Sequence, residues 1–260
     1  MNTRKEIGYY LKNVITVAIY IAFFYFVVMN ILKAENASIV VFNVLIGVFV
    51  GGFAVLYEIM RFFYDAATKA LIVDCDPDKC LALLNRVKKI DFIKSFTTSI
   101  RMMKMLCYVD KRDYESLEAL LKEVDAEEKK DYDVEIVSAH SKMVMYGEAS
   151  MKGKMNEAFK YYEKLRDMKN NRGKRYKGAY FFNNDLVLAD HKMYEKDPKG
   201  ALNYLKDITS DNMNKREAMH FHLSKTRVYK SFHMDYQEEK ELALKVTGKN
   251  AVMREYIESL

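Results

Sequence analysis

The sequence is poor in the residues that end or interrupt regular structure. Its 260 residues include 10 glycines, 2 prolines and no tryptophan, whereas average usage would give roughly 30 glycines and prolines together. This scarcity excludes collagen-like, proline-rich and low-complexity chains. It also argues against a many-stranded β-sandwich, which needs turn residues about every 8–12 positions. We therefore expect an all-α protein.

The apolar residues are concentrated in the first quarter of the chain. Half of all residues are hydrophobic, yet the mean hydropathy is −0.24. Two uncharged runs, of 20 and 22 residues, are separated by only three residues. About 20 apolar residues cross the hydrocarbon layer as a helix, and neither run has the polar stripe of an ordinary core helix. We predict a transmembrane hairpin over 13–57, with spans at about 13–32 and 37–57, and not a cleaved signal peptide.

The basic residues around the hairpin predict its orientation. Three precede the first span, one lies in the connection and two follow the second span: Arg4, Lys5 and Lys12, then Lys33, then Arg61 and Lys69. Short loops rich in Lys and Arg stay on the cytoplasmic side. We expect an integral membrane protein, of the cell membrane if bacterial. Its N-terminal flank (1–12) and its remaining domain (58–260) are then both cytoplasmic.

Gly47 and Gly51 form a GxxxG pair within the second run. Such a pair lets another helix approach closely in a membrane. Two partners fit this pattern: the first span of the same chain, or the same helix of a second copy in a homodimer.

A pattern of one small residue followed by large apolar residues recurs in the remaining three-quarters of the chain. The small residues are Cys80, Ser116, Ala158 and Ala201, spaced by 36, 42 and 43, with a weaker fifth copy at Ala243. Another helical pattern precedes each later copy; these patterns cover 93–108, 134–151, 179–194 and 216–232. Stacking such helix pairs buries the face that one pair alone leaves open.

The only two prolines support the same register. Pro77 and Pro198 each lie three residues before the small residue and follow Asp76 and Asp197. Aspartate at the N-cap and proline in the first turn are typical of a helix start. By the same phase, the helix before Asp76 should run back through Tyr57–Leu71 into the second span.

The repeats resemble the tetratricopeptide repeat (TPR). Residues 147–165 look like the turn and second helix of that family, and Ala189 to Leu205 is similar. The chain departs from the family in lacking tryptophan and a closing proline, and its spacing exceeds 34 residues. The resemblance implies a TPR-like α-solenoid of about four to five helix pairs over roughly 60–247.

The resemblance also implies a concave groove lined by the first helix of each pair. Carrying the register over assigns it these residues: Arg101, Met105, Tyr108, His140, Met143, Met151, Asn183, Leu186, Asp190, Met193, Tyr194, Lys225 and Phe232. Met143, Leu186 and Val228 stand where the carboxylate-clamping members need polar or basic residues. A groove rich in Met and Tyr would suit apolar or helical peptides. The alternative is that these residues are core, or lie under a C-terminal helix near Ala251–Leu260.

The basic segment between two of the repeats is a second candidate surface. It contains Arg166, Lys169, Arg172, Lys174, Arg175 and Lys177. It can be a solvated loop, a contact for anionic lipid headgroups or a contact for an acidic partner. Nucleic acid is not favoured, because from residue 73 onward 36 basic residues face 32 acidic ones.

The search for catalytic, cofactor or metal motifs is negative. Gly153-Lys154 belongs to a near-miss of a phosphate-binding loop, which lacks the Ser/Thr and the preceding strand. The three cysteines have no metal spacing, and His220 and His222 point about 200° apart on a helix. We predict no cofactor, no metal site and no enzymatic activity, although a scattered active site stays a third alternative.

These expectations give one leading function and one alternative from another class. The leading function is a membrane-anchored scaffold that recruits a protein or peptide partner. The alternative is an accessory subunit of a membrane enzyme or transporter, assembled through the hairpin and its glycine face.

Overall fold

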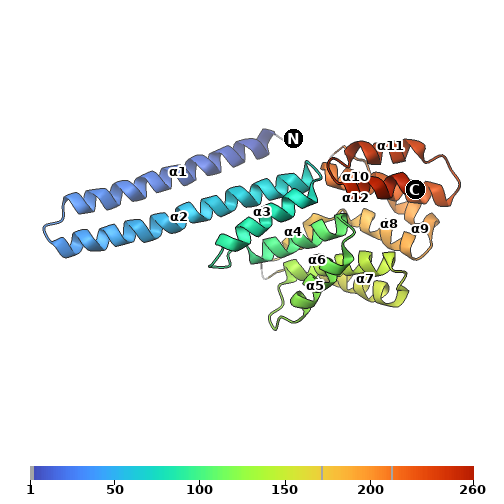
Figure 1. The fold of residues 1–260 in the computed structure, drawn as a ribbon, viewed down its shortest axis with the longest axis horizontal. Coiled ribbons are helices and arrows are strands. Elements are labelled where there is room, and N and C mark those ends of the chain that lie inside the picture. Colours follow the sequence, from blue (N-terminus) through green and yellow to red (C-terminus); the bar gives the residue numbers. More distant parts are fainter. Residues whose placement is uncertain (1–2, 171, 212) are drawn as a thin grey trace. The chain divides into compact units, whose positions relative to one another are not determined.

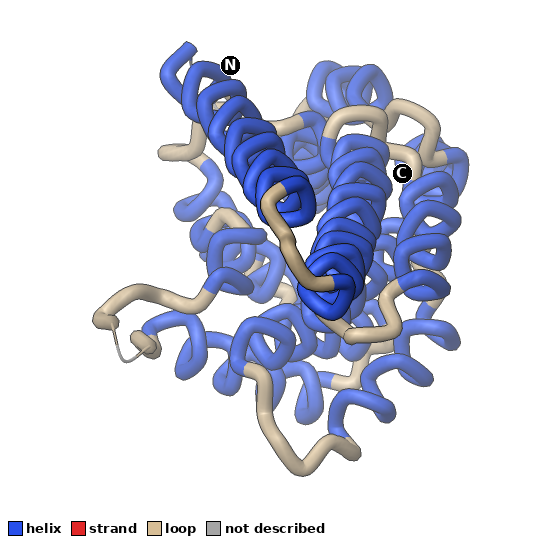
Figure 2. The backbone as a smooth tube through the Cα atoms, turned by 90° about the vertical axis from the view of Figure 1, so that its left-hand side faces the viewer, coloured by secondary structure: helices blue, strands red, loops and turns tan. Residues whose placement is uncertain are grey.

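The computed structural model describes residues 3–170, 172–211 and 213–260, with side chains from residue 14 onward. These residues form twelve α-helices and one short 3-10 helix, without a strand beyond the isolated bridge between Lys169 and Arg175 (Figures 1 and 2). The all-helical fold is thus confirmed. The chain divides into two compact units, Met1–Phe62 and Phe63–Leu260.

The first unit is a pair of long apolar helices. They are α1 (Thr3–Leu32) and α2 (Ala37–Ile72), whose part from Phe63 onward belongs to the second unit. Both are long and apolar enough to cross a membrane, and only 6% of the most apolar window of each is buried. A core helix of a soluble protein would be mostly buried, so these helices lack the protein cover that such a helix has. α2 is a single helix up to Ile72, as the repeat phase predicts.

The two glycines of the GxxxG pair face the other helix of the same hairpin. A Cβ added at Gly51 would lie 2.7 Å from the Phe24 ring, and one at Gly47 would lie 3.2 Å from Val27. Of the two partners considered for this face, α1 is the one that occupies it in the structure.

The second unit contains the remaining helices. They are α3 (Pro77–Ile90), α4 (Thr97–Asp110), α5 (Tyr114–Asp125), α6 (Tyr132–Glu148), α7 (Lys152–Asp167), η1 (Lys177–Phe181), α8 (Asn184–Tyr194), α9 (Pro198–Leu205), α10 (Lys215–Ser231), α11 (Gln237–Val246) and α12 (Ala251–Ser259). Helices that follow one another pack together, notably α6 on α7, α8 on α9 and α10 on α11, while α4 also packs on α3 and α6.

Two of the helix starts differ from the sequence prediction. The helix expected from residue 93 begins at Thr97, because the Asp91 carboxylate accepts hydrogen bonds from the Ser95 and Phe96 amides and holds a loop. The helix expected from residue 179 begins at Asn184, where Asn183 caps the first turn. Side chains that bond to nearby amides compete with the helix at such places.

Five helix ends carry the same turn. Cys75, Arg112, Ser150, Lys196 and His233 follow the first helix of successive pairs, and all have left-handed backbones with φ between 48° and 63°. The amide one residue further on donates to a carbonyl five or six residues back, which closes the helix end. Five different residue types occupy this position, so the sequence pattern does not reveal it.

The second helix of each pair begins as predicted where aspartate precedes it. Asp76 accepts from the Lys79 amide, Asp197 from the Gly200 amide, and Asp113 caps α5 in the same way. The small residues that follow are largely enclosed: Cys80, Ala201 and Ala243 are fully buried. The repeated start therefore places the repeated small residue against a neighbouring helix.

The end of the second unit lies against its beginning. The Lys249 amide donates to the Asp74 carbonyl at 3.2 Å, and Asn250 Nδ2 donates to the Asp110 carbonyl at 2.8 Å. Gly248 has φ +58°, and a Cβ there would lie 2.2 Å from the Asp74 oxygen, so this close approach requires glycine. Residues far apart in the chain thus enclose a common interior.

Candidate functional site

The interior of the second unit contains a small polar cavity, which we call the inner cavity. Its volume is about 70 Å³, room for about five water-sized atoms. Five of the thirteen residues assigned to the groove line it: His140, Asn183, Leu186, Asp190 and Tyr194. Helix α12 also contributes Met253 and Tyr256 to the lining. The C-terminal helix therefore covers part of the expected groove, as one of the alternatives had it.

One wall of the inner cavity is a cluster around Glu148 at the end of α6. Arg112 Nη2 lies 2.5 Å from Glu148 Oε2, the Tyr194 hydroxyl donates to Oε1 at 3.0 Å, and Arg227 Nη1 lies 3.6 Å away. The Arg112 guanidinium also lies over the Tyr256 ring at 3.9 Å. One carboxylate thus joins residues from α6, α8, α10 and the turn after α4.

The glycine beside Glu148 makes this wall possible. A Cβ on Gly147 would lie 2.5 Å from the Tyr194 ring, a distance that packed atoms do not tolerate. The ring can therefore pass over the α6 backbone and place its hydroxyl on Glu148. Burial raises the pKa of Tyr194 well above its usual value, which keeps the hydroxyl a hydrogen-bond donor.

A second cluster pairs α4 with α10. Arg216 donates to both carboxylate oxygens of Asp110 at 2.6 and 2.8 Å, and His220 Nε2 lies 2.9 Å from Oδ1. Burial alone would raise the pKa of Asp110, but Arg216 and His220 outweigh it and lower the value to about 2. Arg216 and His220 line the inner cavity, and both bind Asp110.

Two further polar side chains, Asp190 and His140, line the cavity, and neither has an ion pair within 4 Å. Ser224 Oγ donates to Asp190 at 2.5 Å, and burial raises the pKa of that carboxyl, which favours its uncharged form. His140 is stacked on Phe182 with 3.8 Å between ring centroids. Burial, with Arg216 and His220, lowers the pKa of His140 to about 3. Its Nδ1 has no hydrogen-bond partner within the described residues.

A larger groove, which we call the α4–α5 groove, lies elsewhere on the second unit. Its volume is about 550 Å³, and it takes in Arg101 and Tyr108 of the predicted set, together with Lys88, Lys104 and Leu120. Arg101 is held by two hydrogen bonds to Glu127, at 2.8 and 2.5 Å. Burial, and then the neighbouring Lys88, lower the pKa of Lys104. The groove thus has two lysines that repel each other.

The remaining groove residues lie elsewhere. Met105 and Met143 are fully buried, so for these two the prediction of a groove lining is wrong. The 3.6-residue period cannot tell the face turned to a neighbouring helix from the face turned to a groove. Met151 precedes α7 and is 48% exposed, and Phe232 is 38% exposed after α10. Met193 packs beside the core formed by α8, α9 and α10.

Lys225 also stays outside the inner cavity, because it pairs with Glu239. The same carboxylate accepts from His222 at 2.7 Å, while His220 bonds to Asp110. The two histidines therefore have different partners. The described residues contain no group of three or more His, Cys, Asp or Glu side chains that could hold a metal ion.

Most of the cavity residues escaped the sequence analysis, among them the charged residues Arg112, Glu148 and Arg227. Arg112 lies in a turn, outside any helical pattern. Glu148 and Arg227 are charged residues at the ends of apolar helical patterns, where solvated side chains are common. The available signal is Gly147, since a glycine within a helix often marks a close packing contact.

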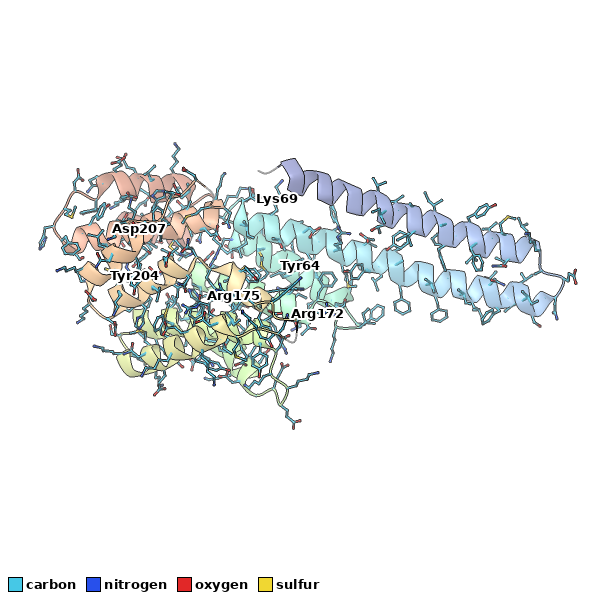
Figure 3. All side chains as sticks on the ribbon, turned by 180° about the vertical axis from the view of Figure 1, so that it is seen from behind. Tyr64, Lys69, Arg172, Arg175, Tyr204 and Asp207 are labelled. Carbon is cyan, nitrogen blue, oxygen red and sulfur yellow. The ribbon has the colours of Figure 1, made fainter. Side chains whose placement is uncertain are left out.

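The predicted basic segment lies mostly in an exposed loop before η1. The Lys169–Arg175 bridge closes it, and Arg166 is held by Asp167 and Asn184. The other five cations of the segment are exposed, and none has an ion pair within the described residues. Two of them, Arg172 and Arg175, are labelled in Figure 3.

Comparison with known families, curated proteins and solved structures finds no match to this chain. The resemblance to tetratricopeptide repeats therefore depends on this chain's own residues and stays a prediction.

Proposed function

We propose that the protein is a membrane-anchored scaffold: the hairpin spans the bilayer, and a cytoplasmic TPR-like solenoid recruits a protein partner. The observation that carries this proposal is the uncovered surface of α1 and α2. Exposed apolar side chains such as Phe49 (64%) and Val48 (66%) lie all round the hairpin. Lipid is the medium in which such a surface is stable.

The repeated turns support the solenoid. Five helix pairs end their first helix with the same left-handed residue, and their second helices carry the repeated small residue. Identical supersecondary units that follow one another along a chain are typical of repeat arrays, which serve as extended binding surfaces.

The α4–α5 groove is the best surface for the partner. It is much larger than the inner cavity, with Ile100 and Leu120 among its lining residues. Lys88 and Lys104 add positive charge, and neither has an ion pair within 4 Å among the described residues, while Asp91, Glu123 and Glu127 line the same groove. The partner that fits is an amphipathic helix with acidic side chains, because its apolar face can cover the floor while its acids reach the lysines.

A photo-cross-linking residue placed at Leu120 in the full chain tests this proposal in native membranes. The matched control places the same group at Glu118, on the exposed side of α5. We expect a defined cross-linked partner from Leu120, none from Glu118, and loss of the product when Lys88 and Lys104 are both changed to Glu. Equal products from the two positions, or a product that survives the charge reversal, would reject the groove.

A further inference from the structure

The loop between α3 and α4 (residues 91–96), which we call the α3–α4 loop, presents two large apolar side chains on its outside. Phe92 is 66% exposed and Ile93 is 55% exposed. Single exposed apolar residues are common on soluble proteins, but these two are neighbours at the tip of one short loop. Neither is among the described residues that line the α4–α5 groove, so the tip is a surface of its own.

The side chain at the start of the α3–α4 loop holds the loop in shape. Asp91 Oδ1 accepts from the Ser95 amide at 2.8 Å and from the Ser95 hydroxyl at 3.0 Å, while Oδ2 accepts from the Phe96 amide at 2.7 Å. Lys94 has a left-handed backbone with φ +58°, which helps the chain to reverse its direction. The exposure of the apolar pair is therefore a property of a hydrogen-bonded turn.

Helix α3 runs back along the last turns of α2. Only residues 73–76 join the two helices, and the Arg86 guanidinium lies 6.0 Å from the centroid of the Phe63 ring. At the end of the loop, the Phe96 ring lies 5.5 Å from the Tyr64 ring. The α3–α4 loop therefore lies at the end of the second unit where α2 enters it, and Figure 1 shows α3 beside that part of α2.

This position is close to the end of the second apolar run. Glu58 is the first charged residue after the run, and Phe63 follows it by only about 8 Å along the helix. From Arg86 to its end at Ile90, α3 returns by about 6 Å in the direction of the run. The headgroup layer on each side of the hydrocarbon is about 5–8 Å thick. With the run in the bilayer, the loop lies at the level of the headgroups.

The surroundings of the tip carry surplus positive charge. Segment 86–96 has four basic residues and one acidic residue, namely Arg86, Lys88, Lys89, Lys94 and Asp91. The adjacent end of α2 (58–72) is balanced, with two acids and two bases. The other charged residues of the α4–α5 groove also balance, namely Glu123 and Glu127 with Arg101 and Lys104. Lysines in the last turn also suit the C-terminus of α3, so the charge supports the inference and the apolar pair carries it.

We propose that the α3–α4 loop is a second membrane contact. Phe92 and Ile93 enter the interfacial layer of the leaflet on the side of the second unit, and the neighbouring lysines meet anionic lipid headgroups. The inference rests on the proposed function, because it needs the hairpin in the bilayer. Apolar side chains beside basic ones are typical of surfaces that lie in this layer. The contact limits the rotation of the second unit about α2.

A single introduced tryptophan tests the proposal, because the chain has none of its own. The full chain carrying Phe92→Trp is reconstituted in vesicles of equal parts phosphatidylcholine and phosphatidylserine. Phosphatidylcholine brominated on its acyl chains then quenches a tryptophan that contacts lipid. Phe49→Trp in the hairpin is the positive control, and Tyr180→Trp, at a side chain that is 69% exposed, is the negative control. We expect quenching of Phe92→Trp and Phe49→Trp, and none of Tyr180→Trp.

Further variants connect the quenching to the tip and to its charge. Ile93→Asp, added to Phe92→Trp, should remove most of the quenching, because it puts a carboxylate among the headgroups. The matched change Val252→Asp, at an exposed position of α12, should leave the quenching unchanged. Vesicles of phosphatidylcholine alone should quench Phe92→Trp less than the mixture does. If Phe92→Trp does not fold, Ile93→Trp is the second probe of the same loop.

The controls separate failure of this inference from failure of the proposed function. Quenching of Phe49→Trp without quenching of either loop tryptophan would overturn the inference and leave the membrane hairpin intact; the loop would then face water and be available to a protein. An unquenched Phe49→Trp would reject the hairpin, and the inference with it. Equal quenching of Tyr180→Trp, or quenching unchanged by Ile93→Asp, would also overturn the loop contact. Equal quenching in the two lipid compositions would overturn the part assigned to anionic headgroups.

Discussion

The first unit of this protein exposes its apolar side chains, whereas the second unit buries them. In the first unit, Val48 and Phe49 are more than 60% exposed, whereas in the second unit Leu121, Met143 and Leu205 are at most 2% exposed. The first unit therefore leaves its apolar side chains uncovered by protein, whereas the second encloses them in a core. The difference shows that one chain carries two patterns of hydrophobicity. Uninterrupted apolar runs form the first unit, and periodic apolar positions form the core of the second.

The largest effect is expected from breaking the buried pair in the second unit. Asp110→Asn leaves the Arg216 guanidinium, which is 8% exposed, without its charge partner. Removing one member of a buried pair costs about 3–5 kcal/mol, measurable by urea unfolding in detergent. Glu118→Gln, which breaks an exposed pair with Lys122, should cost less than about 0.5 kcal/mol. Equal effects of the two changes would contradict the buried pair.

Replacing an exposed aromatic residue by arginine should affect membrane insertion in the first unit and not in the second. Phe49 and Tyr180 are both highly exposed, at 64% and 69%. Phe49→Arg should weaken membrane insertion by about 3 kcal/mol, because it puts a charge into hydrocarbon. Tyr180→Arg should leave insertion unchanged. The fraction resistant to alkaline extraction measures this, and a Phe49→Arg variant that inserts normally would contradict a lipid-facing helix.

Acid should destabilise the second unit through His140. Its pKa falls from the ordinary 6.5 to about 3, so between these values the unfolded chain binds a proton that the folded chain excludes. Stability is therefore present above pH 6.5 and is lost as pH falls, by up to about 1.4 kcal/mol per pH unit. His140→Leu should flatten this slope, while His233→Asn, at an exposed turn, should not. A slope unchanged in His140→Leu would contradict the burial of this ring.

The smallest effect concerns the repeated helix starts. Asp113 caps α5, whereas Met151 occupies the same position at α7 without a side-chain cap. Asp113→Ala should cost about 1 kcal/mol, and Met151→Asp should gain up to about the same amount. Urea unfolding of the two variants compares them. A gain from both changes would contradict equivalent turns in the two pairs.

The features that depend on local sequence could be predicted. The apolar runs, the Asp–Pro helix starts and the repeated small residues each signal their structure through neighbouring positions. The capped start at Pro198 and the unbroken helix through Tyr57 follow from such signals. The glycine pair was predicted as a packing face with two candidate partners, and the structure places Phe24 and Val27 of α1 beside it.

The inner cavity could not be predicted, because it depends on contacts over long stretches of chain. Asp110 meets Arg216 across 106 positions, and no periodic pattern connects them. Helix α12 reaches the cavity because the segment before it contacts the first helices of the unit. There Gly248 lies against Asp74, and Asn250 donates to the Asp110 carbonyl. Met143 illustrates what the repeat register cannot predict. A helical period shows which residues share one face of a helix, but not whether that face contacts another helix or a groove.

Cysteine labelling in intact cells tests the membrane arrangement most directly. The native Cys75, Cys80 and Cys107 are all buried, so the background is low. Asn36→Cys lies between the two apolar helices, and Lys174→Cys lies in the exposed basic loop. We predict that an impermeant maleimide labels Asn36→Cys in intact cells and labels Lys174→Cys only after permeabilisation. Labelling of Lys174→Cys in intact cells would contradict a hairpin that holds the helical repeats in the cytoplasm.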